Sequence, residues 1–424
     1  MRFIYADSLD LVDPRYDFVA DRNGPGRKPY WDDVYPHEIL DAPPYSGILV
    51  SRGIVDEKYT EAQAMRFRRS GARAFLRLDA PERAGMDIFG DCGAFTYVNE
   101  DLPPYTPEDT AEFYDDCGFT HGCSVDHIIF DYDPSMKGME GGSPNARARF
   151  DITLANAREF LAASRHMSER FTPMGVVQGW SPDSMAEAAR QLVAMGYDYL
   201  AIGGMVPLKA DQIRRCLDAI RGAIPNSVRI HVLGFAKANE IESFTRFNIT
   251  SFDTSSPLIR AFKDAKQNYY FPNGGTSLGY YTAIRIPQAL ENPKLARQVK
   301  SGALRSEDLA RLEASALECI RAYDKGQAAL DETLGAVLEY NALFAVGKPY
   351  AEVRDGTVMR TLAEQYRTTL TDQAWKRCGC SICRALSVEV VIFRAANRNR
   401  RRGIHNLGVY KSLIDKLTPF GEAS

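Results

Sequence analysis

Short apolar runs recur along residues 46–253, and helical stretches separate several of them. Strands that alternate with helices pair in parallel through right-handed crossovers. Eight candidate strands therefore predict an α/β fold, a closed (β/α)8 barrel of the TIM type rather than an open sheet. The predicted strands are Gly47–Ser51, Ala74–Arg77, Met86–Gly90, His127–Asp131, Met174–Gln178, Tyr199–Gly203, Arg229–Leu233 and Thr250–Asp253. The clearest helices are Thr153–Arg170, Ser184–Met195, Ala210–Ile224 and Ala238–Phe244.

The composition is that of a globular protein rather than a disordered or fibrous one. Of the 424 residues, 45% are hydrophobic and 25% are charged, which is enough apolar chain for a sizeable core. No uninterrupted apolar run approaches the roughly 18 residues of a membrane span. The N-terminal residues Met1-Arg2-Phe3 are not followed by the apolar stretch of a signal peptide. We therefore expect a cytoplasmic protein with no membrane partner.

The net charge of −3 is unevenly distributed. Between Lys376 and Arg402 there are eight Lys and Arg residues and one acid, Glu389, so this segment carries +7 and the rest of the chain −10. A local excess of positive charge attracts phosphate, although a solvated basic helix or loop has the same composition. The candidate nucleic-acid-binding residues are the densest part of the segment: Arg398, Arg400, Arg401 and Arg402.

Three of the eight cysteines are close together in the sequence. Cys378, Cys380 and Cys383 are followed by His405, whereas the other five are scattered and are expected to be reduced, mostly buried thiols. Three thiolates and one imidazole make a complete tetrahedral shell for Zn²⁺. Because four protein ligands leave no position open for water, we expect this zinc to be structural.

The patterns outside the barrel divide the chain into four predicted parts. An irregular N-terminal extension, 1–45, is rich in Pro, Tyr and Asp, and the barrel core follows at 46–266. Residues 267–370 are predicted to be a loop followed by a helical insertion. A zinc-binding subdomain with a short C-terminal helix occupies 371–424.

Several polar residues stand at the ends of the predicted strands, where a barrel builds its active site. Two of them, Asp91 and Asp253, are carboxylates. Such a pair suits chemistry at an anomeric carbon, where one carboxylate attacks C1′ and the other moves protons. Each aspartate alone is more often a helix cap or turn residue.

Other strand-end residues suit recognition of a flat ring. Asp131 can accept hydrogen bonds from adjacent N–H groups, and Gln178 can both donate and accept. Gly203 and Gly204 let the backbone come close to a ring, and Phe95 can stack on it. Alternatively, the two glycines only form a turn that ends a strand, and Phe95 belongs to the hydrophobic core.

Six stretches, in order, resemble motifs of the tRNA-guanine transglycosylase superfamily. They are Asp91-Cys92-Gly93-Ala94-Phe95, Asp126–Asp131, Gly175–Gly179, Ala201–Met205, Phe252-Asp253 with Pro257, and the zinc-ligand set ending in His405-Asn406-Leu407. The family is a zinc-containing (β/α)8 barrel that exchanges guanine in a polynucleotide for a 7-deazaguanine. The resemblance covers about residues 88–410.

The resemblance implies a role for each candidate residue. Asp253 would be the nucleophile at C1′ and Asp91 the general acid and base toward the departing and arriving bases. Base binding would fall to Phe95, Asp131, Gln178, Gly203, Gly204 and Met205.

Departures from the family motifs point to its DNA-modifying branch, whose members insert 7-cyano-7-deazaguanine. The segment Met205–Leu208 lacks a carboxylate that the family often has there, which favours an uncharged 7-cyano base over an aminomethyl base. The helical insertion and the N-terminal segment Tyr5–Asp10 resemble that branch, and the resemblance implies a companion ATPase. A tRNA-modifying enzyme and a non-catalytic nucleic-acid-binding subunit remain alternatives, and a 7-amido product is not separated from a 7-cyano one.

Overall fold

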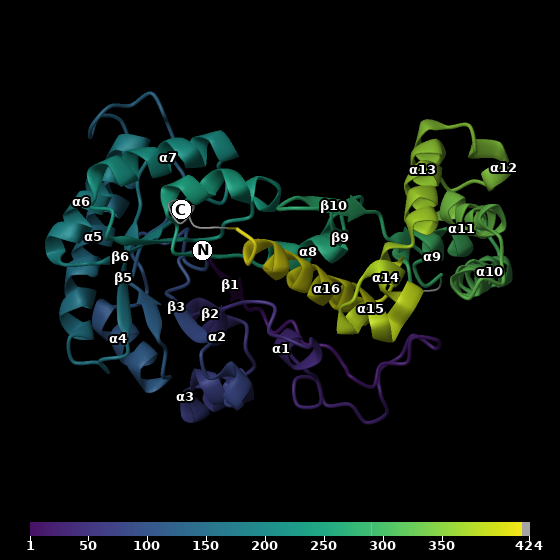
Figure 1. Ribbon diagram of the computed structural model, residues 1–424, viewed down its shortest axis with the longest axis horizontal. Helices are drawn as coiled ribbons and strands as arrows, with labels where there is room; N and C mark the ends of the chain where they lie inside the picture. The colour runs from purple at the N-terminus through teal and green to yellow at the C-terminus, as the bar shows by residue number, and fades with distance from the viewer. Residues whose placement is uncertain (290, 418–424) are drawn as a thin grey trace. The chain divides into compact units, whose positions relative to one another are not determined.

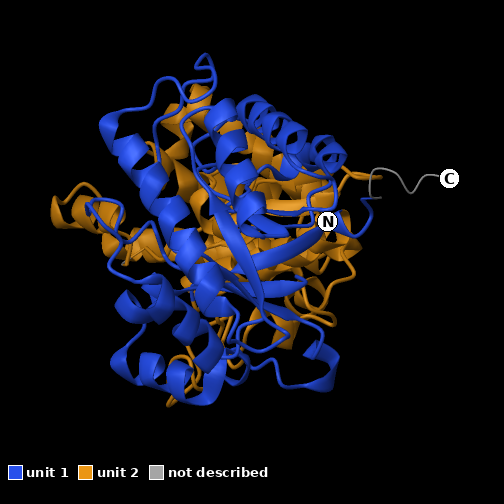
Figure 2. Ribbon diagram, turned by 90° about the vertical axis from the view of Figure 1, so that its left-hand side faces the viewer, with its two compact units in different colours: residues 1–8, 45–255, 414–424 blue, residues 9–44, 256–413 orange. Residues whose placement is uncertain are grey.

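The computed structural model describes residues 1–289 and 291–417, and it separates into two compact units (Figure 2). Unit 1 contains residues 1–8, residues 45–255 and the segment that starts at Ile414. Unit 2 contains residues 9–44 and 256–413. Among the described residues, no helix is both long and apolar enough to cross a membrane.

Unit 1 is a closed barrel of parallel strands, which confirms the predicted fold class (Figure 1). Strand β8 pairs with β1 through Phe3↔Phe252 and so closes the sheet. The inward side chains, including Ile4, Leu49 and Met174, pack into the core of the barrel. The strands are β1 (Arg2–Ala6), β2 (Gly47–Ser51), β3 (Asp87–Asp91), β4 (His121–Cys123), β5 (Thr172–Val177), β6 (Tyr199–Ile202), β7 (Arg229–Val232) and β8 (Ser251–Asp253).

Helices surround the barrel, and local signals set their ends. The Ser181 side chain accepts from the backbone N–H of Ser184 at the start of α6, and Gly196 ends that helix in the left-handed conformation. The helical elements of unit 1 are α2 (Arg52–Glu57), α3 (Glu61–Phe75), η1 (Pro81–Arg83), α4 (Pro107–Asp116), α5 (Pro144–Ser164), α6 (Pro182–Met195), α7 (Ala210–Ala223) and the 3-10 segment η2 (Ala238–Phe247).

Two of the eight predicted strands are wrong and two barrel strands, β1 and β4, were not predicted, although the number of strands is right. The first barrel strand is β1, so the predicted extension 1–45 contains part of the barrel. Residues 74–77 lie at the end of α3 and beyond it, because their apolar side chains belong to the buried face of an amphipathic helix. The fourth strand is β4, His121–Cys123, and residues 127–131 form a loop.

Unit 2 combines the N-terminal segment 9–44 with the C-terminal half of the chain. The predicted loop at 267–288 contains an antiparallel hairpin, β9 (Tyr269–Pro272) with β10 (Leu278–Tyr281), and β11 (Ile284–Arg285), which pairs in parallel with β12 (Ile392–Phe393). Its helical elements are α1 (Pro36–Ile39), α8 (Ser256–Lys263), α9 (Pro293–Lys300), α10 (Ser306–Asp324), α11 (Leu330–Ala345), α12 (Tyr350–Val353), α13 (Thr357–Asp372), α14 (Ala374–Arg377), α15 (Ser381–Leu386), η3 (Ser387–Val391) and α16 (Ala396–Ile414).

Candidate active site

A cavity of about 330 Å³ opens at the carboxyl ends of the barrel strands, entirely within unit 1. Its lining contains four aspartates, one after β1 and others at or after β3, β4 and β8: Asp7, Asp91, Asp126 and Asp253. Among the residues that the structure describes, no Lys or Arg lines it. The cavity therefore offers hydrogen-bond acceptors and negative charge to a ligand.

The Asp253 carboxylate is buried at the end of β8 and is held by two donors. Its Oδ1 accepts from the backbone N–H of Gly234 at 3.0 Å and lies 3.2 Å from Nε2 of His231. The other ring nitrogen of His231, Nδ1, lies 2.5 Å from Oγ of Ser251, which lies 2.6 Å from the Tyr199 hydroxyl. A buried polar chain therefore runs through the barrel interior and ends at Asp253.

Barrel register explains this chain. His231 on β7 is paired with Ser251 on β8, and Asp253 is two residues further along β8, so both β8 side chains share one face. His231 was not among the predicted site residues. The available signal was a histidine in the middle of an otherwise apolar strand.

Asp91, at the end of β3, has a carboxyl group with a raised pKa. Burial, and then the negative charges of Asp126 and Asp253, raise the pKa of its carboxyl to about 7. The N–H of Gly93 donates to its Oδ2 at 3.1 Å. The sequence Asp91–Gly93 fits this turn because Gly93 has φ +89°, and a Cβ there would lie 2.7 Å from the backbone of Gly53.

Asp126 and Gln178 form the polar wall of the cavity beside Asp91. Nε2 of Gln178 donates to Oδ2 of Asp126 at 2.7 Å, and the Cys92 thiol donates to Oδ1 at 3.1 Å. The ligand atoms of Asp91, Cys92 and Asp126 all lie within 4.8 Å of one another. Burial raises the pKa of Asp126. Asp126 is the first residue of one of the family motifs, but its place in the cavity was not predicted.

Two glycines keep this wall open. Gly203 has no side chain to collide with Gln178, whose Nε2 would be 2.4 Å from an added Cβ. Gly204 has φ +71°, and both glycines line the cavity. Phe95 also lines it, with a side chain that is 60% exposed and a ring centroid 6.4 Å from that of Phe130. A flat ligand therefore has an aromatic surface and close backbone available to it.

Comparison with known proteins decides the family. No family model matches the chain. A curated relative, the DNA-guanine transglycosylase of Salmonella montevideo, is 42% identical over 417 residues, or 96% of this chain and 95% of the relative. The chain belongs to the DNA-guanine transglycosylase family. This confirms the resemblance seen in the motifs, and the protein is a pentosyltransferase.

Two of the predicted base-binding residues of this transglycosylase do not line the cavity. Asp131 is exposed, and its Oδ2 accepts from the backbone N–H of Ser143 at 3.2 Å. Since β4 ends at Cys123, the carboxylate that reaches the cavity is Asp126, five residues earlier. Met205 is buried in the protein, and its neighbour Val206 lines the cavity instead. The assignments of Asp131 and Met205 to this cavity are therefore wrong.

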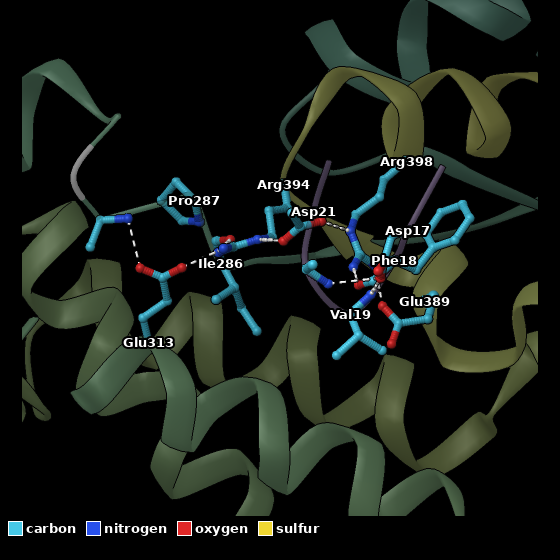
Figure 3. A network of polar contacts seen from close by, with 12 residues as sticks. Asp17, Phe18, Val19, Asp21, Ile286, Pro287, Glu313, Glu389, Arg394 and Arg398 are labelled. Atoms are coloured by element: carbon cyan, nitrogen blue, oxygen red, sulfur yellow. Dashed lines mark hydrogen bonds and ion pairs between the residues drawn. The ribbon is translucent and has the colours of Figure 1, made fainter. Parts of the chain in front are cut away.

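The arginines predicted to bind nucleic acid are mostly internal to unit 2 of the transglycosylase, and Figure 3 shows one of them, Arg398, beside Asp21 and Glu389. Arg398 is fully buried, with its guanidinium on the carboxylates of Asp21, at 2.7 Å, and Glu389. Arg402 is also fully buried and donates to the Ala261 carbonyl at 2.5 Å.

Arg401 donates to the Asp13 carbonyl at 2.8 Å and is 6% exposed. Because these guanidinium groups have partners inside the fold, the prediction is wrong for Arg398, Arg401 and Arg402. Arg400 is partly exposed and donates to the Leu11 carbonyl at 3.0 Å, and its role stays a prediction.

The predicted metal ligands of the transglycosylase do come together. The ligand atoms of Cys378, Cys380, Cys383 and His405 all lie within 4.8 Å of one another. Nδ1 of His405 is 3.4–3.6 Å from the three sulfurs. Nε2 of His405 lies 2.8 Å from the Tyr270 carbonyl, and donation to that carbonyl leaves Nδ1 as the ligand atom. This donor set can hold a metal ion.

Proposed function

We propose that the enzyme replaces guanine in DNA with a 7-deazaguanine through a covalent intermediate on Asp253. The main support is a difference between two carboxyl groups in one cavity. Asp253 is held by two donors, as a positioned nucleophile requires, whereas the pKa of Asp91 is raised to about 7, as an acid and base at neutral pH requires. The relative's name, DNA-guanine transglycosylase, supports guanine in DNA as the substrate.

The reaction then needs two displacements at C1′. In the first, a carboxylate oxygen of Asp253 bonds to C1′ as the bond from C1′ to N9 of guanine breaks. The electron pair leaves on guanine, and Asp91 supplies the proton. In the second, Asp91 takes the N9 proton of the incoming base. N9 of that base bonds to C1′, and Asp253 leaves as a carboxylate, so enzyme and protons are restored.

Recognition of the base falls to the polar wall. The Asp126 carboxylate can accept from the N–H groups of a guanine edge, while Gln178 and the backbone at Gly204 read the remaining polar atoms. Phe95 supplies the stacking surface. We propose 7-cyano-7-deazaguanine as the incoming base. The segment Met205–Leu208 has no carboxylate that could bind an aminomethyl group, and Val206, which lines the cavity, is apolar.

We propose that Cys378, Cys380, Cys383 and His405 hold Zn²⁺. Three thiolates and one imidazole fit a closed tetrahedral site, and zinc there contributes folding free energy rather than chemistry. The site ties residues 378–383 to α16, which carries His405.

A base inside a duplex must be flipped out before C1′ can be reached, at a cost of a few kcal/mol. Resemblance to the DNA-modifying branch supports a companion ATPase that opens the duplex.

Exchange of labelled guanine tests the proposed function. The protein is given duplex DNA or tRNA, with labelled guanine or 7-cyano-7-deazaguanine, with and without cell extract. Incorporation into DNA alone is expected, and dependence on extract would indicate the companion. Incorporation into tRNA alone would show that the substrate is tRNA and not DNA. No incorporation into either would favour a non-catalytic subunit that binds nucleic acid.

A further inference from the structure

A second cavity, of about 400 Å³, lies entirely within unit 2. Its walls come from β11, β12, α11, α13 and the segment before β9. Two cationic side chains, Lys266 and Arg285, line it, and no carboxylate of residues 1–289 or 291–417 does. This charge is opposite to that of the active-site cavity, whose lining contains four aspartates.

Arg285 and Lys266 are both solvent-exposed, and Arg285 has its backbone held in a sheet ladder. Its backbone pairs with Phe393 in the β11–β12 ladder, and its carbonyl accepts from Nδ2 of Asn341 at 2.9 Å. The guanidinium lies 4.5 Å from the ring centroid of Phe344 and 5.2 Å from that of Phe393. Among the described residues, neither the Arg285 guanidinium nor the Lys266 ammonium has a carboxylate or hydrogen-bond partner. Their N–H donors are therefore available to a ligand.

The opposite wall also favours an anion. The first turn of α13 lines the cavity through Thr357, Val358 and Thr361. Gly356, at the N-cap, has no side chain that could accept from the first N–H groups of the helix. The positive end of the helix dipole thus adds to the two cations. Three aromatic or aliphatic side chains, Phe344, Leu362 and Phe393, give the cavity an apolar wall, and Asn341 and Gln365 add amide groups.

We propose that this cavity binds a nucleotide, with its phosphate on Arg285 and Lys266 and its base against the apolar wall. A phosphate needs cations and N–H donors, a base needs an apolar flat surface, and a cavity of about 300–1,000 Å³ is the usual size for such ligands. This site is not part of the proposed function. The proposal rests on that function only in the choice of DNA as the polymer for the test. The nucleotide has two sources, a DNA strand or a free nucleotide.

The first test removes both cations with the double variant Lys266→Gln/Arg285→Gln. The matched control is Arg305→Gln/Arg311→Gln, which removes the same charge from α10 and the residue before it, where both side chains are at least 70% exposed. Binding of a fluorescein-labelled single-stranded oligonucleotide is followed by anisotropy between 50 and 200 mM salt, and binding of dGMP by calorimetry.

The cation-free variant should bind the oligonucleotide about tenfold more weakly. The slope of log affinity against log salt should fall by about 0.7, since both cations contact one phosphate and each neutralised phosphate of a single strand contributes about 0.7. The control should stay within twofold of the wild type. Loss of oligonucleotide binding alone assigns the site to the strand, and loss of dGMP binding assigns it to a free nucleotide.

A second variant decides the matter if the first fails to fold. Val358→Glu places a carboxylate at a cavity position that is 54% exposed, and Val19→Glu places one elsewhere in unit 2 at a position that is 74% exposed. Val358→Glu should weaken binding and Val19→Glu should not. Unchanged binding of both probes by the cavity variants would overturn the proposal. Guanine exchange by the wild type, measured in parallel, separates that result from a failure of the proposed function.

Discussion

Removal of His231 should slow exchange without preventing binding of the base. His231 does not line the cavity, but its Nε2 lies beside Oδ1 of Asp253. We therefore expect His231 to affect the reaction by positioning Asp253. Its hydrogen bonds are satisfied together when Tyr199 donates to Ser251, Ser251 donates to Nδ1, and Nε2–H donates to Asp253. Burial raises the pKa of Tyr199 to about 12, so its hydroxyl stays a donor at neutral pH.

The contacts set the size of the effect. A hydrogen bond to a charged group contributes about 1.5–3 kcal/mol, and about 1.4 kcal/mol corresponds to a tenfold change in rate. With only the Gly234 N–H left on Oδ1, His231→Ala should lower kcat by about 10- to 150-fold. His231→Gln retains an amide donor and should recover part of the loss. Tyr199→Phe loses a neutral hydrogen bond one link further away, worth about 1 kcal/mol, and should cost at most about tenfold.

Single-turnover exchange of labelled guanine measures the series, with KM and thermal unfolding recorded for each variant. A positioning role predicts the smallest loss of kcat for Tyr199→Phe, a larger one for His231→Gln and the largest for His231→Ala. KM for the incoming base should change less than threefold in all three. The reasoning would be refuted if His231→Ala kept wild-type kcat, or if its loss of rate followed only the loss of folded protein.

Three further predictions concern the wall, the acid and the metal. Asp126→Asn should raise KM for the base at least tenfold, while Asp131→Asn should leave it within twofold, and steady-state exchange distinguishes them. Burial raises the folded pKa of Asp91 from 3.8 to about 7, so stability falls as pH rises from about 3.8 to about 7, by up to about 4 kcal/mol, and stays lower above that pH. Asp91→Asn should therefore raise the unfolding temperature at pH 8 but not at pH 3.5, and an equal shift at both would contradict the cause. Cys380→Ser should lower the zinc content below one ion per chain, as metal analysis would show. It should also destabilise unit 2 by several kcal/mol, as thermal unfolding would show.

The sequence predicted the barrel and most of its active-site end because both follow from local patterns. Apolar runs mark most of the strands, and the carboxyl ends of parallel strands meet at one end of a barrel. Asp91, Gln178 and Asp253, which line the cavity, were predicted in this way, and their roles stay predictions. The strand β4 was not, since His121-Gly122-Cys123 has no apolar run, and Gly122 is required because an added Cβ would lie 2.4 Å from the Tyr114 ring. That error moved the expected carboxylate from Asp126 to Asp131.

Long-range pairing accounts for the other errors. The arginine-rich segment has the composition of a basic surface, but the carboxylate of Asp21 that binds Arg398 lies 377 positions away in the chain. The contact between His231 and Asp253 depends on the register of β7 and β8, which local periodicity does not specify. Composition revealed the charge of these residues, and only the fold revealed their partners.

The covalent intermediate is the most direct test of the central claim. Enzyme is incubated with duplex DNA in the absence of an incoming base, denatured with acid, digested, and analysed by mass spectrometry for a peptide joined to a strand that has lost guanine. The account predicts a DNA adduct on Asp253 that disappears on addition of 7-cyano-7-deazaguanine and is absent from Asp253→Ala. An adduct on another residue, or one that persists in Asp253→Ala, would contradict it.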